Sequence, residues 1–218
     1  MPLKYACFIS YRHATGFSAR FVKELYEALH ERLQVLVDTS HGPVIIDQER
    51  LKSGGTLYNP ALSSALCQSA CLVVIFTPVY FNKKHTYCAR EYRAMVMLEK
   101  ERLKLLEGKG DPTNGLVIPV VFRGWNRLPE EISKNRQCYR FDQFQPYHKK
   151  LGQGRLYSVE IEEMASYIAL RFEELNNLTT DLSLKCSDFK LPTDREIRDW
   201  LDRVALRPMS FPLRSEGE

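Results

Sequence analysis

The chain has 218 residues, enough for one domain with an appendage or at most two small domains. Hydrophobic residues make up 44% of it and charged residues 27%, a balance that supplies a core and excludes a disordered chain. The net charge of +4 comes from scattered basic residues, which gives no argument for nucleic-acid binding. No segment has the roughly 20 apolar residues of a membrane span, and residues 1–10 lack a signal-peptide pattern. We therefore expect a soluble, cytoplasmic protein that binds neither nucleic acid nor membranes.

The first half of the chain alternates short apolar runs with amphipathic segments. Residues 5–10 predict a first strand, and residues 44–46 predict a brief second strand that ends on Asp47. Between them, apolar positions at helical period follow Ser18, which is a suitable cap for a helix. Asn59-Pro60 then predicts the start of a further helix, because proline is favoured at the first helical position.

The unbroken apolar run at residues 70–76 is rich in β-branched residues and too short for a buried helix. It predicts a strand that is covered on both faces, at the centre of a parallel sheet. Thr77-Pro78 ends this strand, since proline cannot continue a central ladder. Thr86 is a suitable cap for the long helix that follows, and Gly108 is a suitable terminator.

The second half continues the alternation. Residues 116–122 predict a fourth strand, in which Pro119 indicates an edge position or a bulge. We expect a short helix over residues 130–133 and an edge strand over residues 137–141. A last long helix, beginning at Ser158, carries an apolar stripe that would cover the sheet.

Strand and helix alternate five times, which predicts an α/β fold with a doubly wound five-stranded parallel sheet. The composition changes near Leu178 to Thr, Asp, Ser and Pro, with one amphipathic segment over residues 194–205. We therefore expect one domain over residues 1–176 and a partly helical C-terminal extension over residues 177–218. The domain should fold without this extension, which would serve docking or autoinhibition.

The cysteines lie inside apolar or helical segments. They are Cys7, Cys67, Cys71, Cys88, Cys138 and Cys186. Their spacing is not that of a metal site, because no second pair or partner histidine accompanies them. Cytoplasmic cysteines are kept reduced and are commonly buried. We expect reduced, mostly buried thiols and no bound metal.

The loop after the first strand argues against three functions that such sheets often carry. Ser10, Tyr11, Arg12 and His13 offer no clustered acids, which a phosphoacceptor receiver domain needs to hold its metal. The segment also lacks the Thr- and Gly-rich phosphate loop of flavin-binding proteins. The GxGxxG pattern of a dinucleotide-binding fold is absent as well.

Glu91 and Tyr87 are four residues apart on the helix that follows the central strand, so they share one helix face. In open α/β sheets, ligands bind beyond the carboxyl ends of the strands. A carboxylate and an aromatic ring there could form a site. A glutamate in the second turn of a helix is, however, more often a solvated surface residue.

Three segments resemble the signatures of the Toll/interleukin-1 receptor (TIR) domain family. Residues 8–12, FISYR, resemble the first signature, and Asp47 with Leu51 and Gly54 resembles the second strand and its BB loop. Residues 87–91, YCARE, resemble the aromatic-Cys-x-x-Glu motif, with tyrosine where tryptophan is common. The resemblance extends from Tyr5 to about residue 175 and implies a flavodoxin-like TIR fold.

The TIR family includes adaptors that only assemble and enzymes that cleave NAD+ at the nicotinamide–ribose bond. For the enzymes, one carboxylate suffices, because nicotinamide leaves a pyridinium as a neutral molecule and needs no acid. The resemblance implies that Glu91 is catalytic and that Tyr87 is an aromatic plate for the substrate. The other candidate substrate-binding residues are Ser10, Tyr11, Arg12 and Asp47.

The implied function is that of an NAD+ glycohydrolase or ADP-ribosyl cyclase in defence or immune signalling. NAD+ is then a substrate and no cofactor is needed, while a downstream effector would sense an ADP-ribose-derived product. Self-association through TIR–TIR contacts, sensitive to charge at Arg50 or Lys52, would accompany the activity. The alternative is a catalytically silent adaptor that acts by homotypic assembly. Nucleoside deoxyribosyl transfer, which uses a carboxylate nucleophile, is a third and weaker possibility.

Overall fold

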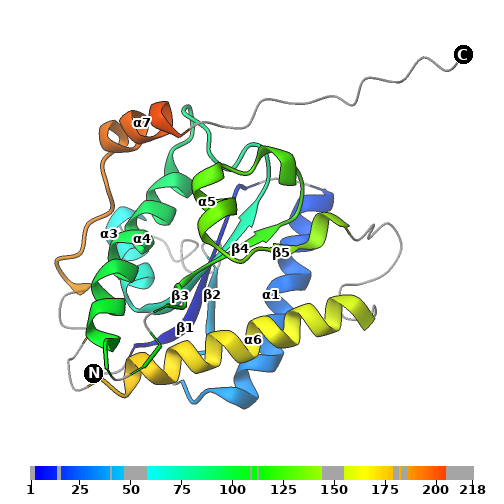
Figure 1. Ribbon diagram of the computed structural model, residues 1–218, viewed down its shortest axis with the longest axis vertical. Coiled ribbons are helices and arrows are strands. Elements are labelled where there is room, and N and C mark those ends of the chain that lie inside the picture. The colour runs from blue at the N-terminus through cyan, green and yellow to red at the C-terminus, as the bar shows by residue number, and fades with distance from the viewer. Residues whose placement is uncertain are drawn as a thin grey trace, which may run out of the picture.

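The computed structural model describes residues 3–13, 16–39, 41–46, 58–108, 110–111, 113–143, 155–178, 182 and 186–204. Within these ranges the strands form one parallel sheet in the order β2-β1-β3-β4-β5 (Figure 1). The strands are β1 (Tyr5–Tyr11), β2 (Val44–Ile46), β3 (Ser69–Phe76), β4 (Val117–Val121) and β5 (Tyr139–Arg140). This is the flavodoxin-like order, so the predicted fold class is confirmed.

The strand β3 is the centre of the sheet, and every one of its residues is buried. It pairs with β1 on one side, where Ile9 faces Val73, and with β4 on the other, where Val73 faces Ile118. A strand covered by helices on both faces has no polar side, which explains its unbroken apolar run.

Helices cover both faces of the sheet (Figure 1). On one face α1 (Phe17–Leu36) packs against α6 (Arg155–Asn176), and on the other α3 (Tyr58–Cys67) packs against α4 (Tyr87–Leu106). The expected stripe of α6 is buried: Ile161, Ala165, Ile168, Phe172 and Leu175. The remaining short elements are η1 (Trp125–Arg127), α5 (Glu130–Asn135) and η2 (Phe141–Gln143). No helix within the described ranges combines the length and the apolar character that crossing a membrane requires.

The strand β4 is not an edge strand, although it contains Pro119. It lies between β3 and β5, and Pro119 is aligned with Val74 of β3. The edge strand β5 has only two residues and pairs with Val120 and Val121. Because this pairing begins beyond Pro119, the missing amide of the proline falls outside the β4–β5 ladder.

The C-terminal extension is packed on the domain and is not separate from it. Its helix α7 (Asp194–Arg203) contacts α4 (Figure 1). Its side chains Ile197, Trp200 and Leu201 are at most 7% exposed and belong to the same hydrophobic cluster as the sheet. The structure therefore joins α7 to the hydrophobic core, and the folding of residues 1–176 without the extension stays a prediction. An amphipathic helix this short is stable only when its apolar face is buried, and α4 supplies the surface.

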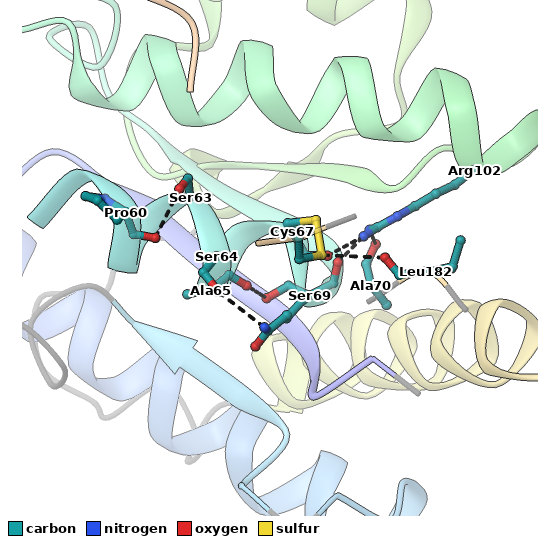
Figure 2. Close-up of a disulfide and its surroundings, with 11 residues drawn as sticks. Pro60, Ser63, Ser64, Ala65, Cys67, Ser69, Ala70, Arg102 and Leu182 are labelled. Atoms are coloured by element: carbon teal, nitrogen blue, oxygen red, sulfur yellow. Dashed lines mark hydrogen bonds between the residues drawn. A yellow bond between two sulfur atoms is a disulfide. The ribbon is translucent and has the colours of Figure 1, made fainter. Parts of the chain in front are cut away.

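The prediction that every cysteine is a reduced thiol is wrong. Cys67, at the end of α3, and Cys186, in the extension, form a disulfide with 5.4 Å between their Cα atoms (Figure 2). The other cysteines are free thiols, and Cys7, Cys71 and Cys88 are buried as expected. Sequence alone could not pair two cysteines that lie 119 residues apart.

Arg102 of α4 reaches across to the end of α3 beside this disulfide (Figure 2). Its guanidinium donates to the carbonyl oxygens of Cys67 at 2.5 Å and of Ser69 at 2.6 Å. Burial lowers the pKa of Arg102 to about 10, so the side chain remains charged at neutral pH. The last carbonyl groups of a helix have no partner within the helix, and Arg102 satisfies that of Cys67 together with that of Ser69 at the start of β3.

Candidate active site

Glu91 lies in the second turn of α4 and is only 4% exposed. It is thus not the solvated surface residue that its position in a helix would ordinarily indicate. The helix begins at Tyr87, after Thr86, as expected. The Thr86 hydroxyl does not cap α4, however, and instead donates to Asp194 of α7 at 2.6 Å. A buried carboxylate needs hydrogen-bond donors, and the first comes from β1.

Ser10 donates a hydrogen bond from its hydroxyl to the Glu91 carboxylate. It is the penultimate residue of β1 and is 1% exposed. The two side chains meet because β1 pairs in parallel with β3, and α4 follows β3. The structure therefore brings together two of the site residues that were predicted from the sequence.

Tyr80 completes this arrangement and was not predicted. Its hydroxyl lies 2.5 Å from the Ser10 Oγ, and its side chain is fully buried in the turn after β3. Burial raises the pKa of Tyr80 well above its ordinary value, and Cys88 and Glu91 raise it further. Tyr80 is therefore protonated at neutral pH. Because the single proton of Ser10 points to Glu91, Tyr80 must donate to Ser10.

The hydrogen bonds from Tyr80 to Ser10 and from Ser10 to Glu91 lie where the sheet reverses its strand order. After β1 the polypeptide passes to β2 on one side of β1, and later to β3 on the other side. In open α/β sheets, ligands bind at such a switch point, beyond the carboxyl ends of the strands. The position of Glu91 is thus the position expected of a ligand-binding group.

The sequence of the chain matches the family model described as the TIR domain over residues 7–153. The chain belongs to the TIR domain family. The matched span contains all three residues of the hydrogen-bond chain.

Among solved structures, this TIR domain is similar to the TIR domains of the activated Roq1 resistosome directly recognizing the pathogen effector XopQ. The identity is 22%, the similarity covers 84% of this chain and 94% of that chain, and the TM-score is 0.36. The family assignment rests on the sequence match over residues 7–153. Comparison with curated proteins finds no match.

The other predicted site residues of the TIR domain have different surroundings. Tyr11 is 6% exposed, and its ring stacks on His13 with 5.0 Å between centroids, so it packs inside the domain. Arg12 follows β1 and is partly exposed. Tyr87 is 46% exposed, and the Arg90 guanidinium lies 5.6 Å from its ring centroid. Of these three side chains, those of Tyr87 and Arg12 reach the surface, and that of Tyr11 does not.

Asp47 and the residues that resemble the BB loop, from Arg50 to Gly54, lie outside the described residues. Cys88 is buried and donates through its Sγ to the carbonyl oxygen of Tyr11 at 3.4 Å, which agrees with a packing role. In the part of the TIR domain that the structure describes, no group of His, Cys, Asp and Glu could hold a metal ion.

Proposed function

We propose that this TIR domain cleaves NAD+ at the nicotinamide–ribose bond, with Glu91 as the catalytic carboxylate. The observation that carries the proposal is the burial of Glu91 beside Ser10 at the switch point of the sheet. Burial of a charged group is unfavourable unless it is hydrogen-bonded. A buried carboxylate at the edge of the sheet where α/β folds bind ligands is a candidate catalytic group.

The chemistry requires only one carboxylate. When the bond between the ribose C1′ and the nicotinamide nitrogen breaks, its electron pair neutralises the pyridinium, and neutral nicotinamide leaves. Positive charge develops on the ribose ring, and an adjacent carboxylate stabilises it. A water molecule then attacks C1′ and releases a proton to solvent, which gives ADP-ribose. In a cyclase, a nitrogen of the adenine ring takes the place of water.

The hydrogen bond from Ser10 supports this role by fixing the orientation of the carboxylate before substrate arrives. Tyr80 in turn fixes the orientation of the Ser10 hydroxyl. A preorganised charge in a site with little water stabilises a transition state more strongly than the same charge in solution. The exposed ring of Tyr87 would stack on the substrate, and Arg12 would contact its phosphates.

Incubation of the purified protein with NAD+, followed by mass analysis of the products, tests the proposal. We expect release of nicotinamide together with linear or cyclic ADP-ribose. NADH is the matched control, because its dihydronicotinamide is uncharged and cannot leave as a stable neutral molecule without an acid. Release of the ring from both substrates would contradict the mechanism. Absence of cleavage at every protein concentration would favour the silent adaptor instead.

The resemblance to TIR domains also leads us to propose self-association, with a product that a partner effector senses. The rate per molecule should then rise with protein concentration, and charge reversal at Arg50 should reduce that rise. A specific activity that stays constant over a wide concentration range, with monomeric protein throughout, would contradict this part of the proposal.

A further inference from the structure

The helix α7 touches the residues that neighbour the hydrogen-bond chain of the site. Trp200 stacks on Tyr92, with 5.7 Å between ring centroids, and meets Phe81 edge-on at 5.4 Å. Tyr92 directly follows Glu91, and Phe81 directly follows Tyr80. The Trp200 indole ring, only 7% exposed, therefore packs against the side chains of the residues that directly follow Glu91 and Tyr80, the two ends of the hydrogen-bond chain.

Polar contacts attach α7 to the beginning of α4 as well. Asp194 accepts the hydrogen bond from Thr86, the residue before α4. Arg90, in the first turn of α4, donates through its Nε to the carbonyl oxygen of Pro192 at 2.7 Å. Lys83, in the preceding loop, forms an ion pair with Asp202. The polar contacts of the extension thus gather on the loop before α4 and on the first turn of α4, which directly precedes Glu91.

The path of the extension is fixed at a second point. The disulfide between Cys67 and Cys186 ties the extension to the end of α3 shortly before α7 begins (Figure 2). The helix α7 itself begins with a capping box, in which Thr193 and Glu196 exchange hydrogen bonds. The extension is therefore held at two places, by the disulfide at the end of α3 and by the contacts of α7 with α4.

We propose that α7 is a positioning element for the Glu91 site, with Trp200 as the positioning residue. Trp200 acts through Tyr92 and Phe81, and Asp194 acts through Thr86, so that the first turns of α4 hold Glu91 against Ser10. Displacement of α7 then lowers turnover, because catalytic groups lose rate steeply with misplacements of about 1 Å. The expected effect on turnover rests on the proposed NAD+ cleavage. The effect of α7 on the first turns of α4 is tested independently of activity.

The experiment compares Trp200→Ala, Trp200→Phe and Asp194→Ala with the parent. Asp199→Ala is the matched control, because Asp199 lies on the exposed side of the same helix. Two quantities are measured for each protein: the steady-state kcat and KM for NAD+, and hydrogen exchange of the backbone amides at residues 90–93. The second measurement requires no activity.

We expect Trp200→Ala and Asp194→Ala to accelerate exchange at residues 90–93 and to lower kcat about tenfold or more, with KM within about twofold. Trp200→Phe should stay within about twofold of the parent in kcat, because a phenylalanine ring keeps the aromatic contact. Asp199→Ala should match the parent in both quantities.

The proposal is overturned if folded Trp200→Ala exchanges like the parent at residues 90–93 and keeps its kcat. If Trp200→Ala does not fold, Asp194→Ala decides by the same two measurements. If the parent cleaves no NAD+, the proposed function fails, and exchange alone decides: acceleration in Asp194→Ala supports the positioning of α4, and parent-like exchange overturns it.

Discussion

The hydroxyl of Ser10 donates a hydrogen bond to the carboxylate of Glu91, although the two residues are 81 positions apart in the chain. Each is less than 5% exposed. The contact depends on the pairing of β1 with β3 and on the return of the chain through α4. The orientation of the carboxylate is therefore a property of the fold as a whole and not of one loop.

The coupling between Ser10 and Tyr80 gives a first prediction. Ser10→Ala removes the donor to a buried carboxylate, a type of hydrogen bond that contributes about 1.5–3 kcal/mol. Tyr80→Phe removes the donor that orients Ser10. We expect each variant to lower kcat for NAD+, Ser10→Ala by about tenfold or more. In the double variant the losses should not add, because Tyr80 acts through Ser10. Additive losses would show that the two hydroxyls act independently.

The burial of Ile197 gives a second prediction. Ile197 is 1% exposed in α7, so Ile197→Ala should lower the free energy of unfolding by about 2–5 kcal/mol. Leu170→Ala, on the outer face of α6, is the control and should change it by about 0.5 kcal/mol or less, because Leu170 is 50% exposed. Urea unfolding measures both. An Ile197 variant as stable as the control would mean that α7 does not contribute to the core.

The disulfide gives a third prediction. In denaturant without reductant, four of the six cysteines should react with a thiol reagent, and all six should react after reduction. Cys186→Ser should lower the free energy of unfolding by about 2–4 kcal/mol, since it releases a loop closed across 119 positions. Cys138→Ser, at a partly exposed free thiol, should have a much smaller effect. Six reactive cysteines before reduction would contradict the disulfide.

The buried thiol of Cys71 gives a fourth prediction, on alkaline pH. Burial raises the pKa of Cys71 from its ordinary value of 9.0 to about 12, although Arg171 and Arg102 oppose the shift. Above pH 9 the unfolded chain therefore loses this proton while the folded protein keeps it. The contribution of this group to the free energy of unfolding therefore falls as the pH rises from about 9 to about 12. Cys71→Ala should reduce that slope, measured by urea unfolding at each pH. An unchanged slope would mean that Cys71 ionises normally in the folded protein.

The sheet and the position of Glu91 could be predicted from the sequence because their signals are local. The unbroken apolar run at residues 70–76 is typical of a strand that is buried on both faces. The motif at residues 87–91 places its glutamate on the helix that follows this strand. The role of Tyr80 could not be predicted in this way. It lies in an irregular turn, where no periodicity relates it to Ser10 or Glu91.

The surface on which α7 packs could not be predicted for a related reason. The pattern of α7 showed that Ile197 and Trp200 share one face, but a helix pattern does not say which surface will cover that face. The partner surface consists of Tyr92 and Phe81, which come from a helix and a loop more than 100 residues earlier. The pairing of Cys67 with Cys186 could not be predicted for the same reason, because these residues are 119 positions apart in the sequence.

Glu91→Gln tests the central claim most directly, with the rate of nicotinamide release from NAD+ and the urea unfolding curve measured on the same protein. The glutamine oxygen can still accept the hydrogen bond from Ser10, so the folded state should persist with a loss of no more than about 2 kcal/mol. Loss of the negative charge should raise the reaction barrier by at least about 2.7 kcal/mol, on the order of a 100-fold fall in rate. A folded Glu91→Gln protein that releases nicotinamide at nearly the parent rate would contradict the account.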